Sequence, residues 1–560
     1  MAASHNVFRG SQSVAQYFDP ECNPPLPLVE IPDRLNPFRS DNVRIYAKML
    51  TCLPAQNVKS LPALQMLRKE PRAQSRTIAE ASSGSTVLSL GILARVLWGN
   101  KDVEAHVTNK KSAESLNLLR FFGIKPCLYG GLAQQEPTDP TGIMARLRRK
   151  AASSDHIVYL CQYDNHDNWK AHETWTGPQI LRQLPEINIF STTVGTGGCI
   201  TGTGVYLKSQ KPSTKVLGVF NVFGDPTPGP RYFDGFQSSA FPWQETVDSR
   251  VEVSSTDAYR MSMMLSREGL ICGPSSGEAL HGLLEYLQNS KNSGSLAELA
   301  DEQTKEISCV FTCSDLPYQY LPGYFERLNV DEFPPIENEI LLQCDQDKHD
   351  PRWILDSEQA FKLLSAVADH GSDDEVKSML TSLNVSIQRL EKPVERHNRR
   401  SGLSIYFGCW RRSLHMCKRR IRTRKPQPVH QRALPGSSTV ILDLRNRKDY
   451  DKLHIPGSLS APLPGLLHSL GGGDLFGDAH AVHLLWTSMQ KWLQGAELLQ
   501  TFARAVQDHG RIVVLCYDGL ASQLVNSAIR QKGIEAFTVR GGFGALWSRC
   551  QEHAAIFECR

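Results

Sequence analysis

A glycine-dense turn between a β-branched strand and a helix constrains the fold of this chain more than any other feature. Residues 186–204 read EINIFSTTVGTGGCITGTG and predict a short strand, then the turn, then a helix that continues through Lys208. Backbone N–H groups in such a turn point at one spot, and the helix N-terminus adds partial positive charge, so a phosphate dianion can bind there. A plain strand-to-helix turn has the same pattern. The spacing is neither that of a dinucleotide-binding loop nor that of a P-loop, because no Lys-Ser or Lys-Thr pair closes it.

Lys59 stands at a predicted helix start, because Pro62 is tolerated only in the first turn of a helix. A lysine in that place faces the positive end of the helix dipole, which favours the neutral amine that a Schiff base requires. Taken alone, such a lysine is more often a solvated surface charge.

Two further turns are rich in small hydroxyl residues. Ser82-Ser-Gly-Ser-Thr86 follows a predicted strand and offers hydroxyl and N–H groups to a carboxylate. Ser275 lies near a second predicted helix start, in the sequence Gly-Pro-Ser-Ser-Gly-Glu278. Serine N-caps and a capping box between Ser275 and Glu278 explain both segments without a ligand, so neither identifies a site alone.

Taken together and in this order, the four segments resemble the cysteine synthase/cystathionine β-synthase group of pyridoxal-phosphate (PLP) enzymes, which have the tryptophan-synthase-β fold. The resemblance runs from about Asn36 to Thr312 and includes the Asn57-Val-Lys59 motif. It implies that Lys59 is the catalytic lysine that binds PLP as an aldimine. The cofactor-binding residues that it implies are Lys59, Ser85, Gly195, Thr196, Gly197, Gly198 and Ser275. The substrate-binding residues that it implies are Ser82, Ser83, Gly84, Thr86 and Gln162.

Two positions depart from the family pattern. Ser85 stands where the family usually has the asparagine that bonds the cofactor's phenolic oxygen, and Cys199 replaces the last threonine of the phosphate loop. Both changes are compatible with PLP binding. They bear instead on whether the substrate is O-acetylserine, the standard one of the family.

The resemblance implies β-elimination or β-replacement on a cysteine-, serine- or O-acylserine-type amino acid. The released Lys59 is placed to take the Cα proton. A serine hydroxyl at position 275, unlike an aspartate, does not keep the pyridine nitrogen protonated, so a carbanion with a β leaving group expels that group. We therefore expect an aminoacrylate intermediate that a nucleophile captures or water hydrolyses.

The last part of the chain, roughly Ser437 to Leu546, resembles rhodanese domains. Cys516 ends a predicted strand and takes the position of the catalytic cysteine that lies in a cup of backbone amides and carries a persulfide. Ala521 stands where the family has an arginine, so the main cation for an anionic donor such as thiosulfate is absent. A buried structural cysteine is the alternative interpretation.

The chain of 560 residues is too long for a single core, and we predict an α/β architecture with several parts. The resemblance implies that residues 1–345 form a PLP domain of fold type II, and we expect it to have two parallel-sheet subdomains. A helical bridging segment follows over residues 346–394, then a basic linker over 395–436, and an α/β rhodanese-like domain over 437–555. The arginines and lysines of 395–425 fit a disordered linker, a nucleic-acid or nuclear-localisation patch, or a mispredicted gene segment.

Composition excludes several classes of function. The net charge of +4 is nearly balanced, so we expect neither nucleic acid nor a membrane as a partner. The 14 cysteines show no zinc pattern and no disulfide framework, so we expect no metal. Without a signal segment, the cytoplasm is the expected location. Family analogy implies a homodimer with a small amino acid substrate.

Three hypotheses remain open. The first is a PLP enzyme whose rhodanese-like partner receives sulfur on Cys516. The second is a cysteine synthase-like enzyme that makes a β-substituted alanine, with the rhodanese module only as a binding domain. The third is a non-catalytic PLP-binding or regulatory protein, suggested by the departures at Ser85, Cys199 and Ala521.

Overall fold

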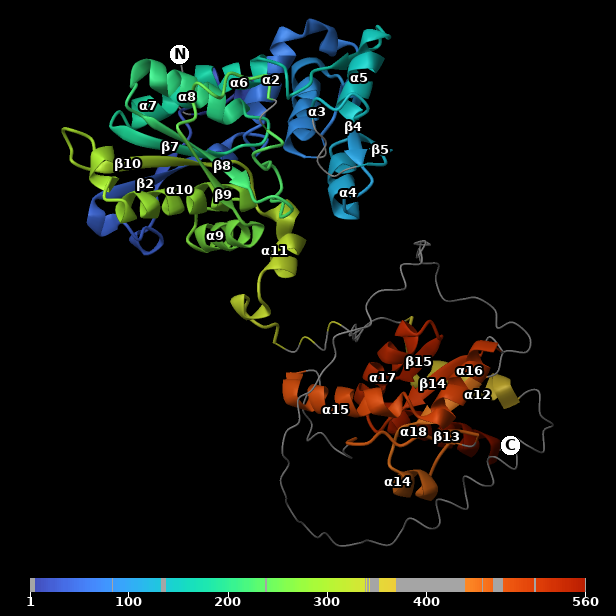
Figure 1. Cartoon of the computed structure of the whole chain (residues 1–560). Coiled ribbons are helices and arrows are strands. Elements are labelled where there is room, and N and C mark those ends of the chain that lie inside the picture. Colours follow the sequence, from blue (N-terminus) through green and yellow to red (C-terminus); the bar gives the residue numbers. More distant parts are fainter. Residues whose placement is uncertain are drawn as a thin grey trace. The chain divides into compact units, whose positions relative to one another are not determined.

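The computed structural model divides the chain into two compact units, Met1–Pro334 and Pro335–Arg560 (Figure 1). It describes residues 6–82, 84–131, 137–236, 239–337, 339, 342, 352–368, 439–455, 457–466, 477–507 and 510–558. Ser83 and the predicted basic linker 395–436 lie outside the described residues. The domain boundaries predicted near residues 345, 395 and 436 fall there as well and stay predictions.

The larger sheet of the first unit has six strands in the order β1-β2-β10-β7-β8-β9. Its strands are β1 (Leu28–Glu30), β2 (Val43–Met49), β7 (Ile187–Thr193), β8 (Lys215–Asn221), β9 (Ser249–Val253) and β10 (Ile307–Cys313). All neighbours are parallel except β1 and β2. β10 is buried along its whole length, as expected of a central parallel strand that is covered on both faces.

Helices cover both faces of this sheet (Figure 1). α9 (Ser255–Arg267) and α10 (Pro274–Asn292) pack on one face, with Leu280 and Leu283 in a core shared with Phe311 of β10. α7 (Gly177–Gln183) and α8 (Gly198–Gln210) pack on the other, where Ile200 joins a core with Phe190 of β7. Each central strand contributes side chains to both cores, because successive side chains point to opposite faces of the sheet.

The smaller sheet of the first unit has four parallel strands in the order β5-β4-β3-β6. Its strands are β3 (Thr77–Glu80), β4 (Val103–Thr108), β5 (Lys125–Tyr129) and β6 (Ile157–Tyr159). α2 (Ser60–Lys69), α3 (Ser85–Trp98) and α4 (Ala113–Phe121) share a core with one face, and α5 (Ile143–Ala152) packs on the other. α1 (Ser13–Phe18), α6 (Asp167–Ala171) and α11 (Leu321–Arg327) complete the unit. The predicted pair of parallel-sheet subdomains is confirmed.

The second unit is built on a five-stranded parallel sheet in the order β11-β15-β14-β12-β13. Its strands are β11 (Ile354–Leu355), β12 (Thr439–Asp443), β13 (Leu459–Ser460), β14 (Arg511–Leu515) and β15 (Ala536–Val539). Helices α15 (Ala479–Trp492), α16 (Ala496–Gln507) and α17 (Leu520–Gln531) cover one face. Helices α12 (Ser357–Ala368) and α18 (Gly542–Glu558) cover the other, and α14 (Arg447–Lys452) follows β12. This is the predicted α/β class of the rhodanese-like part.

Residues 354–368 were assigned from the sequence to the bridging segment. In the structure, Ile354 and Leu355 pair with Thr538 and Val539 of β15, and Ala360 of α12 is buried in the core beneath α18. This stretch is therefore part of the second unit. None of the described helices combines the length and the apolar character needed to cross a bilayer.

Candidate active site

The turn that carries Lys59 is fastened to the end of β10. Val58 N–H donates to the Ser314 carbonyl at 2.7 Å, and Asn57 forms an antiparallel bridge with Asp315. Asn57 Oδ1 accepts hydrogen bonds from the Lys59 N–H at 3.0 Å and from the Ser89 hydroxyl at 2.9 Å. Lys59 itself is the residue before the first turn of α2. The asparagine of the Asn57-Val-Lys59 motif therefore shapes the turn that presents the lysine.

Burial lowers the pKa of the Lys59 amine, while the nearby Cys199 and Asp315 partly offset this effect. The direction agrees with the expectation from the sequence, although the cause differs. Desolvation is the largest influence, whereas the sequence argument relied on the helix dipole. A neutral amine is the nucleophilic form of lysine, so the site favours imine chemistry at Nζ.

The glycine turn after β7 has the geometry of an anion cradle. Gly197 has a φ of +88°, in the left-handed region that favours glycine, and precedes the first turn of α8. A Cβ on Gly195 would lie 2.7 Å from the Gly229 carbonyl, and a Cβ on Gly198 would clash with Asn168 Oδ1. The N–H groups of Gly195, Thr196 and Gly197 find no acceptor among the described residues. Free amides at a helix N-terminus fit the phosphate of PLP.

A chain of hydrogen bonds joins this cradle to the loop of small hydroxyl residues. The Thr86 hydroxyl donates to Gln162 Oε1 at 2.6 Å. Asn168 Nδ2 donates to the Gln162 carbonyl at 2.6 Å and to Thr196 Oγ1 at 3.1 Å. Thr86, Gln162, Asn168 and Thr196 are all buried. The structure thus brings together the predicted carboxylate-binding and phosphate-binding residues, and Asn168, which the sequence analysis missed, connects them.

The remaining members of the carboxylate loop lie at the start of α3. Ser85 is the first residue of that helix, and Gly84 precedes it. The Gly84 N–H donates to Ser82 Oγ at 3.3 Å. Ser83 falls outside the described residues, so its predicted role stays a prediction.

Ser275 is buried in the first turn of α10, and this turn is fastened to the same strand end as the Lys59 turn. Gly273 N–H donates to the Asp315 carbonyl at 2.8 Å, and Ser314 N–H donates to Ser276 Oγ at 3.0 Å. The helix begins at Pro274 after Gly273, and no side chain caps it. The capping box that was an alternative for Ser275 is therefore absent, and the Ser275 hydroxyl is not used to cap the helix.

Two buried titratable groups near Lys59 were not predicted from the sequence. Burial raises the pKa of the Asp315 carboxyl to about 6, and its Oδ2 accepts hydrogen bonds from the Tyr320 hydroxyl at 2.6 Å and from Gln319 at 3.2 Å. Burial, together with the charge of Lys59, lowers the pKa of His172 to about 3. His172 opens a single π-helical turn, a feature often found at functional sites. No local pattern marks either residue.

In the second unit, Cys516 lies in the predicted cup of backbone amides. Its Sγ accepts from Gly519 N–H at 3.1 Å and from Ser522 N–H at 3.3 Å. Burial raises the pKa of this thiol to about 11, although the Ser522 hydroxyl and the two amides act in the opposite direction. Ala521, in the place of the family's arginine, is buried in the core. The amides stabilise a sulfur anion as expected, but desolvation has the larger effect on the pKa of the free thiol.

Comparison with known proteins gives two matching family models. The model described as pyridoxal-phosphate dependent enzyme matches residues 23–297, and the model of the rhodanese-like domain matches residues 428–549. Cysteine synthase from Aquifex aeolicus is 32% identical over 278 residues, which covers 48% of this chain and 82% of that protein. Cysteine synthase B from Pseudomonas aeruginosa is 30% identical over 262 residues, covering 46% and 85%. The solved structure of O-acetylserine sulfhydrylase isoform 3 from Entamoeba histolytica has 22% identity and a TM-score of 0.45, covering 59% and 95%.

Proposed function

The chain belongs to the family of pyridoxal-phosphate-dependent enzymes that includes the cysteine synthases, followed by a rhodanese-like domain, and we propose that it performs β-elimination or β-replacement on a cysteine-, serine- or O-acylserine-type amino acid. PLP, when bound, supplies an aldehyde for the substrate amine and a conjugated ring that withdraws electrons from Cα. The observation that carries the proposal is the joint attachment of the Lys59 turn and the Ser275 helix to Ser314 and Asp315.

In this proposal each predicted residue has a separate task. Lys59 Nζ, whose pKa burial lowers, would accept the Cα proton of the substrate. The amides of residues 195–198 would hold the phosphate of PLP, and the Ser275 hydroxyl would face its ring nitrogen. Gln162 would hold the substrate carboxylate together with Ser82 and Thr86.

The test is the visible spectrum of the purified full-length protein. We expect an absorbance band of enzyme-bound PLP that Lys59→Ala abolishes and that Lys291→Ala, which changes an exposed lysine on α10, leaves intact. Borohydride reduction should fix a pyridoxyl group on Lys59, detected by peptide mass spectrometry. A colourless protein that carries no pyridoxyl group on Lys59 would refute the proposal.

The substrate class follows from adding Cys, Ser and O-acetylserine in turn to the same protein. The amino acid that changes the cofactor band identifies the class, and mass spectrometry of the products with candidate nucleophiles separates replacement from elimination. If none of the three changes a band that is present, the chain binds PLP without acting on these amino acids. That result would favour the non-catalytic hypothesis.

For the second unit we propose that Cys516 carries sulfane sulfur. The Cys516 thiolate attacks the outer sulfur of a persulfide donor R–S–SH, so that a new S–S bond forms on Cys516 and the donor leaves as R–S⁻. The amides of Gly519 and Ser522, which already point at Sγ, support this role. The alternative is a binding domain without sulfur transfer, which the buried Ala521 favours because it offers an anionic donor no cation.

Incubation with a low-molecular-weight persulfide, followed by peptide mass spectrometry, distinguishes these two roles. Sulfur carriage predicts the mass of one added sulfur atom on the Cys516 peptide. Cys516→Ser should abolish this modification, and Cys550→Ser, which changes another buried cysteine of the same unit, should not. A second measurement compares the sulfur species that the parent protein and Cys516→Ser release from cysteine. Equal release by the two proteins would exclude transfer through Cys516.

A further inference from the structure

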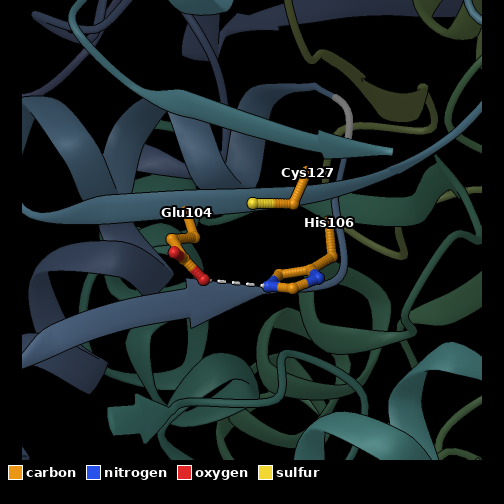
Figure 2. Close-up of side chains that lie close together, drawn as sticks. All are labelled: Glu104, His106 and Cys127. Carbon is orange, nitrogen blue, oxygen red and sulfur yellow. Dashed lines mark hydrogen bonds and ion pairs between the residues drawn. The ribbon is translucent and has the colours of Figure 1, made fainter. Parts of the chain in front are cut away.

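Three side chains with metal-binding atoms meet on the smaller sheet, outside the residues assigned to PLP. Glu104 and His106 lie on β4, and Cys127 lies on β5 directly opposite His106 in the strand register. The carboxylate oxygen, the imidazole nitrogen and the sulfur all lie within 4.8 Å of one another. Figure 2 shows the three side chains pointing toward one another across the two strands.

The backbone holds this cluster in place. Glu104 and His106 are two residues apart on one strand, so both project from the same face of the sheet. Ala105, between the two, and Val107, after His106, point to the opposite face and are buried in its core. Because the ligands come from paired strands and not from loops, their separation is set by the sheet geometry.

The distances suit a small divalent cation. His106 Nε2 and Glu104 Oε2 are 3.2 Å apart. Ligands bound tetrahedrally to zinc at its usual bond lengths lie about 3.3 Å apart for an oxygen–nitrogen pair. The cluster therefore needs little rearrangement to bind a metal. A set of one carboxylate, one imidazole and one thiol matches zinc, whereas calcium and magnesium prefer oxygen ligands alone.

Two lysines also contact Glu104. Lys125 Nζ is 2.9 Å from Oε1, and Lys150 Nζ is 3.5 Å from Oε2. Their side chains are 69% and 47% exposed, so solvent screens both pairs and each lysine is able to turn into water. Lys125 contacts the oxygen that points away from His106, and this contact is compatible with a metal on Oε2.

We propose that Glu104, His106 and Cys127 form a zinc site, with water as the fourth ligand. Binding replaces the thiol proton of Cys127, which is released to solvent, by a sulfur–zinc bond. The metal joins β4 to β5 at the edge of the sheet whose strand β3 leads into the carboxylate loop. The site is independent of the proposed PLP chemistry, so either proposal can fail alone.

The test uses the full-length protein in the Cys516→Ser background, freed of metal with a chelator. Zinc is titrated in competition with a chromophoric chelator, and Co²⁺ is added as a spectroscopic substitute. We expect one tight zinc site and a cobalt–thiolate charge-transfer band. Cys127→Ser should lose that band, and both Cys127→Ser and His106→Gln should bind zinc at least about tenfold more weakly. Cys22→Ser, which changes a half-buried cysteine outside the cluster, should behave as the parent protein does.

Circular dichroism and thermal unfolding establish that each variant is folded. Glu104→Gln provides a third variant in case one of the others misfolds. Zinc affinity and cobalt spectra that are unchanged in folded Cys127→Ser and His106→Gln would overturn the proposal. Absence of any tight zinc site in the parent protein would overturn it as well.

Discussion

The hydroxyl of Thr86 donates to Oε1 of Gln162 at 2.6 Å, although the two residues are 76 positions apart in the chain. In this arrangement the oxygen of the Gln162 amide faces Thr86. Because Oε1 accepts from Thr86, the NH₂ group at the other side of the amide is available as a donor. A carboxylate accepts hydrogen bonds only, so an amide in this orientation suits the carboxylate of an amino acid substrate.

Thr86→Val should therefore weaken substrate binding without affecting the cofactor. Loss of one buried hydrogen bond of about 1 kcal/mol predicts a rise in KM of roughly fivefold, with an unchanged PLP absorbance band. Steady-state kinetics with the amino acid that proves active measure this effect. Thr86→Ser keeps the hydroxyl and is the matched control. A rise in KM for Thr86→Ser but not for Thr86→Val, which keeps the methyl group, would show that the methyl group matters and the hydrogen bond does not.

Gly198→Ala should disrupt the phosphate cradle. A Cβ at this position would clash with Asn168 Oδ1, and Asn168 holds both Gln162 and Thr196. Forcing Asn168 aside predicts a loss of about 1–3 kcal/mol, which appears as weaker PLP binding and as a lower melting temperature. PLP titration and thermal unfolding measure both quantities. Gly130→Ala is the control, because its Cβ would meet no atom within 4 Å.

Features marked by local sequence were predictable. The strand and helix expected on either side of the glycine turn are present as β7 and α8, because a β-branched run and a helix start are local patterns. The helix expected after Lys59 is likewise present as α2. In both places residues close in the chain determine the structure.

Contacts between distant segments were not predictable in the same way. Asp315 lies near Lys59 only because β10 ends beside the Asn57 turn, which depends on strand order and register. The local sequence does not distinguish Asn168 from other polar residues of a short helix. Its role depends on the hydrogen bond that it donates to Thr196 in the folded chain. β11 consists of two residues, too few to show a period, and only its pairing with β15 identifies it. In each case the position of the residue is determined by contacts between segments distant in the chain, which a local sequence pattern does not reveal.

Burial of Lys48 predicts that the stability of the first unit rises with pH. Its Nζ donates to the Leu26 carbonyl at 2.9 Å, to Gln179 at 3.1 Å and to Gln183 at 2.7 Å. Burial, with a smaller effect of Arg182, lowers the pKa of Lys48 to about 7. The unfolded chain has the ordinary lysine pKa of about 10.4, so it binds more protons than the folded chain between pH 7 and pH 10. Stability should rise over this window, with a slope of up to about 1.4 kcal/mol per pH unit.

Urea unfolding of the parent protein and of Lys48→Met at several pH values measures this slope. The variant lacks the titrating group, so its stability should change less with pH, even though it is less stable throughout. Lys291→Met changes a partly exposed lysine and should keep the slope of the parent. Parallel pH profiles for the parent and Lys48→Met would contradict the prediction.

The raised pKa of Cys516, near 11, predicts an unusual pH profile for its alkylation. Only the thiolate reacts, so the alkylation rate should increase about tenfold per pH unit from pH 7 to pH 10. Ser522→Ala should slow the reaction further, because the Ser522 hydroxyl is one of the groups that lower this pKa. Iodoacetamide labelling followed by peptide mass spectrometry gives the rate, with the half-buried Cys22 as an internal comparison. An alkylation rate that stops increasing before the pH reaches 9 would contradict the prediction.

Arg445 should stabilise the segment that lies over the Cys516 turn. Its guanidinium forms a buried ion pair with Asp443 at 2.7 Å, donates to the Leu453 carbonyl at 2.7 Å and lies 3.3 Å from the centre of the Phe543 ring. Phe543 N–H in turn donates to the Cys516 carbonyl at 2.8 Å. Arg445→Met leaves the Asp443 carboxylate buried without its cation and with only the backbone N–H of residue 445 as a donor, at a cost of about 3–5 kcal/mol.

The double variant Asp443→Asn/Arg445→Met distinguishes two effects of Arg445: its ion pair with Asp443 and the packing of its guanidinium on Phe543. Removing both charges should recover much of the stability that Arg445→Met loses, since no buried charge is left uncompensated. In both Arg445→Met and the double variant, Cys516 alkylation should be faster than in the parent protein, because neither variant keeps the guanidinium that packs on Phe543 beside the turn. Urea unfolding and alkylation rates of the three proteins measure the two effects separately. If the double variant regained stability and parental alkylation rates together, the guanidinium over Phe543 would have no part in holding the Cys516 turn closed.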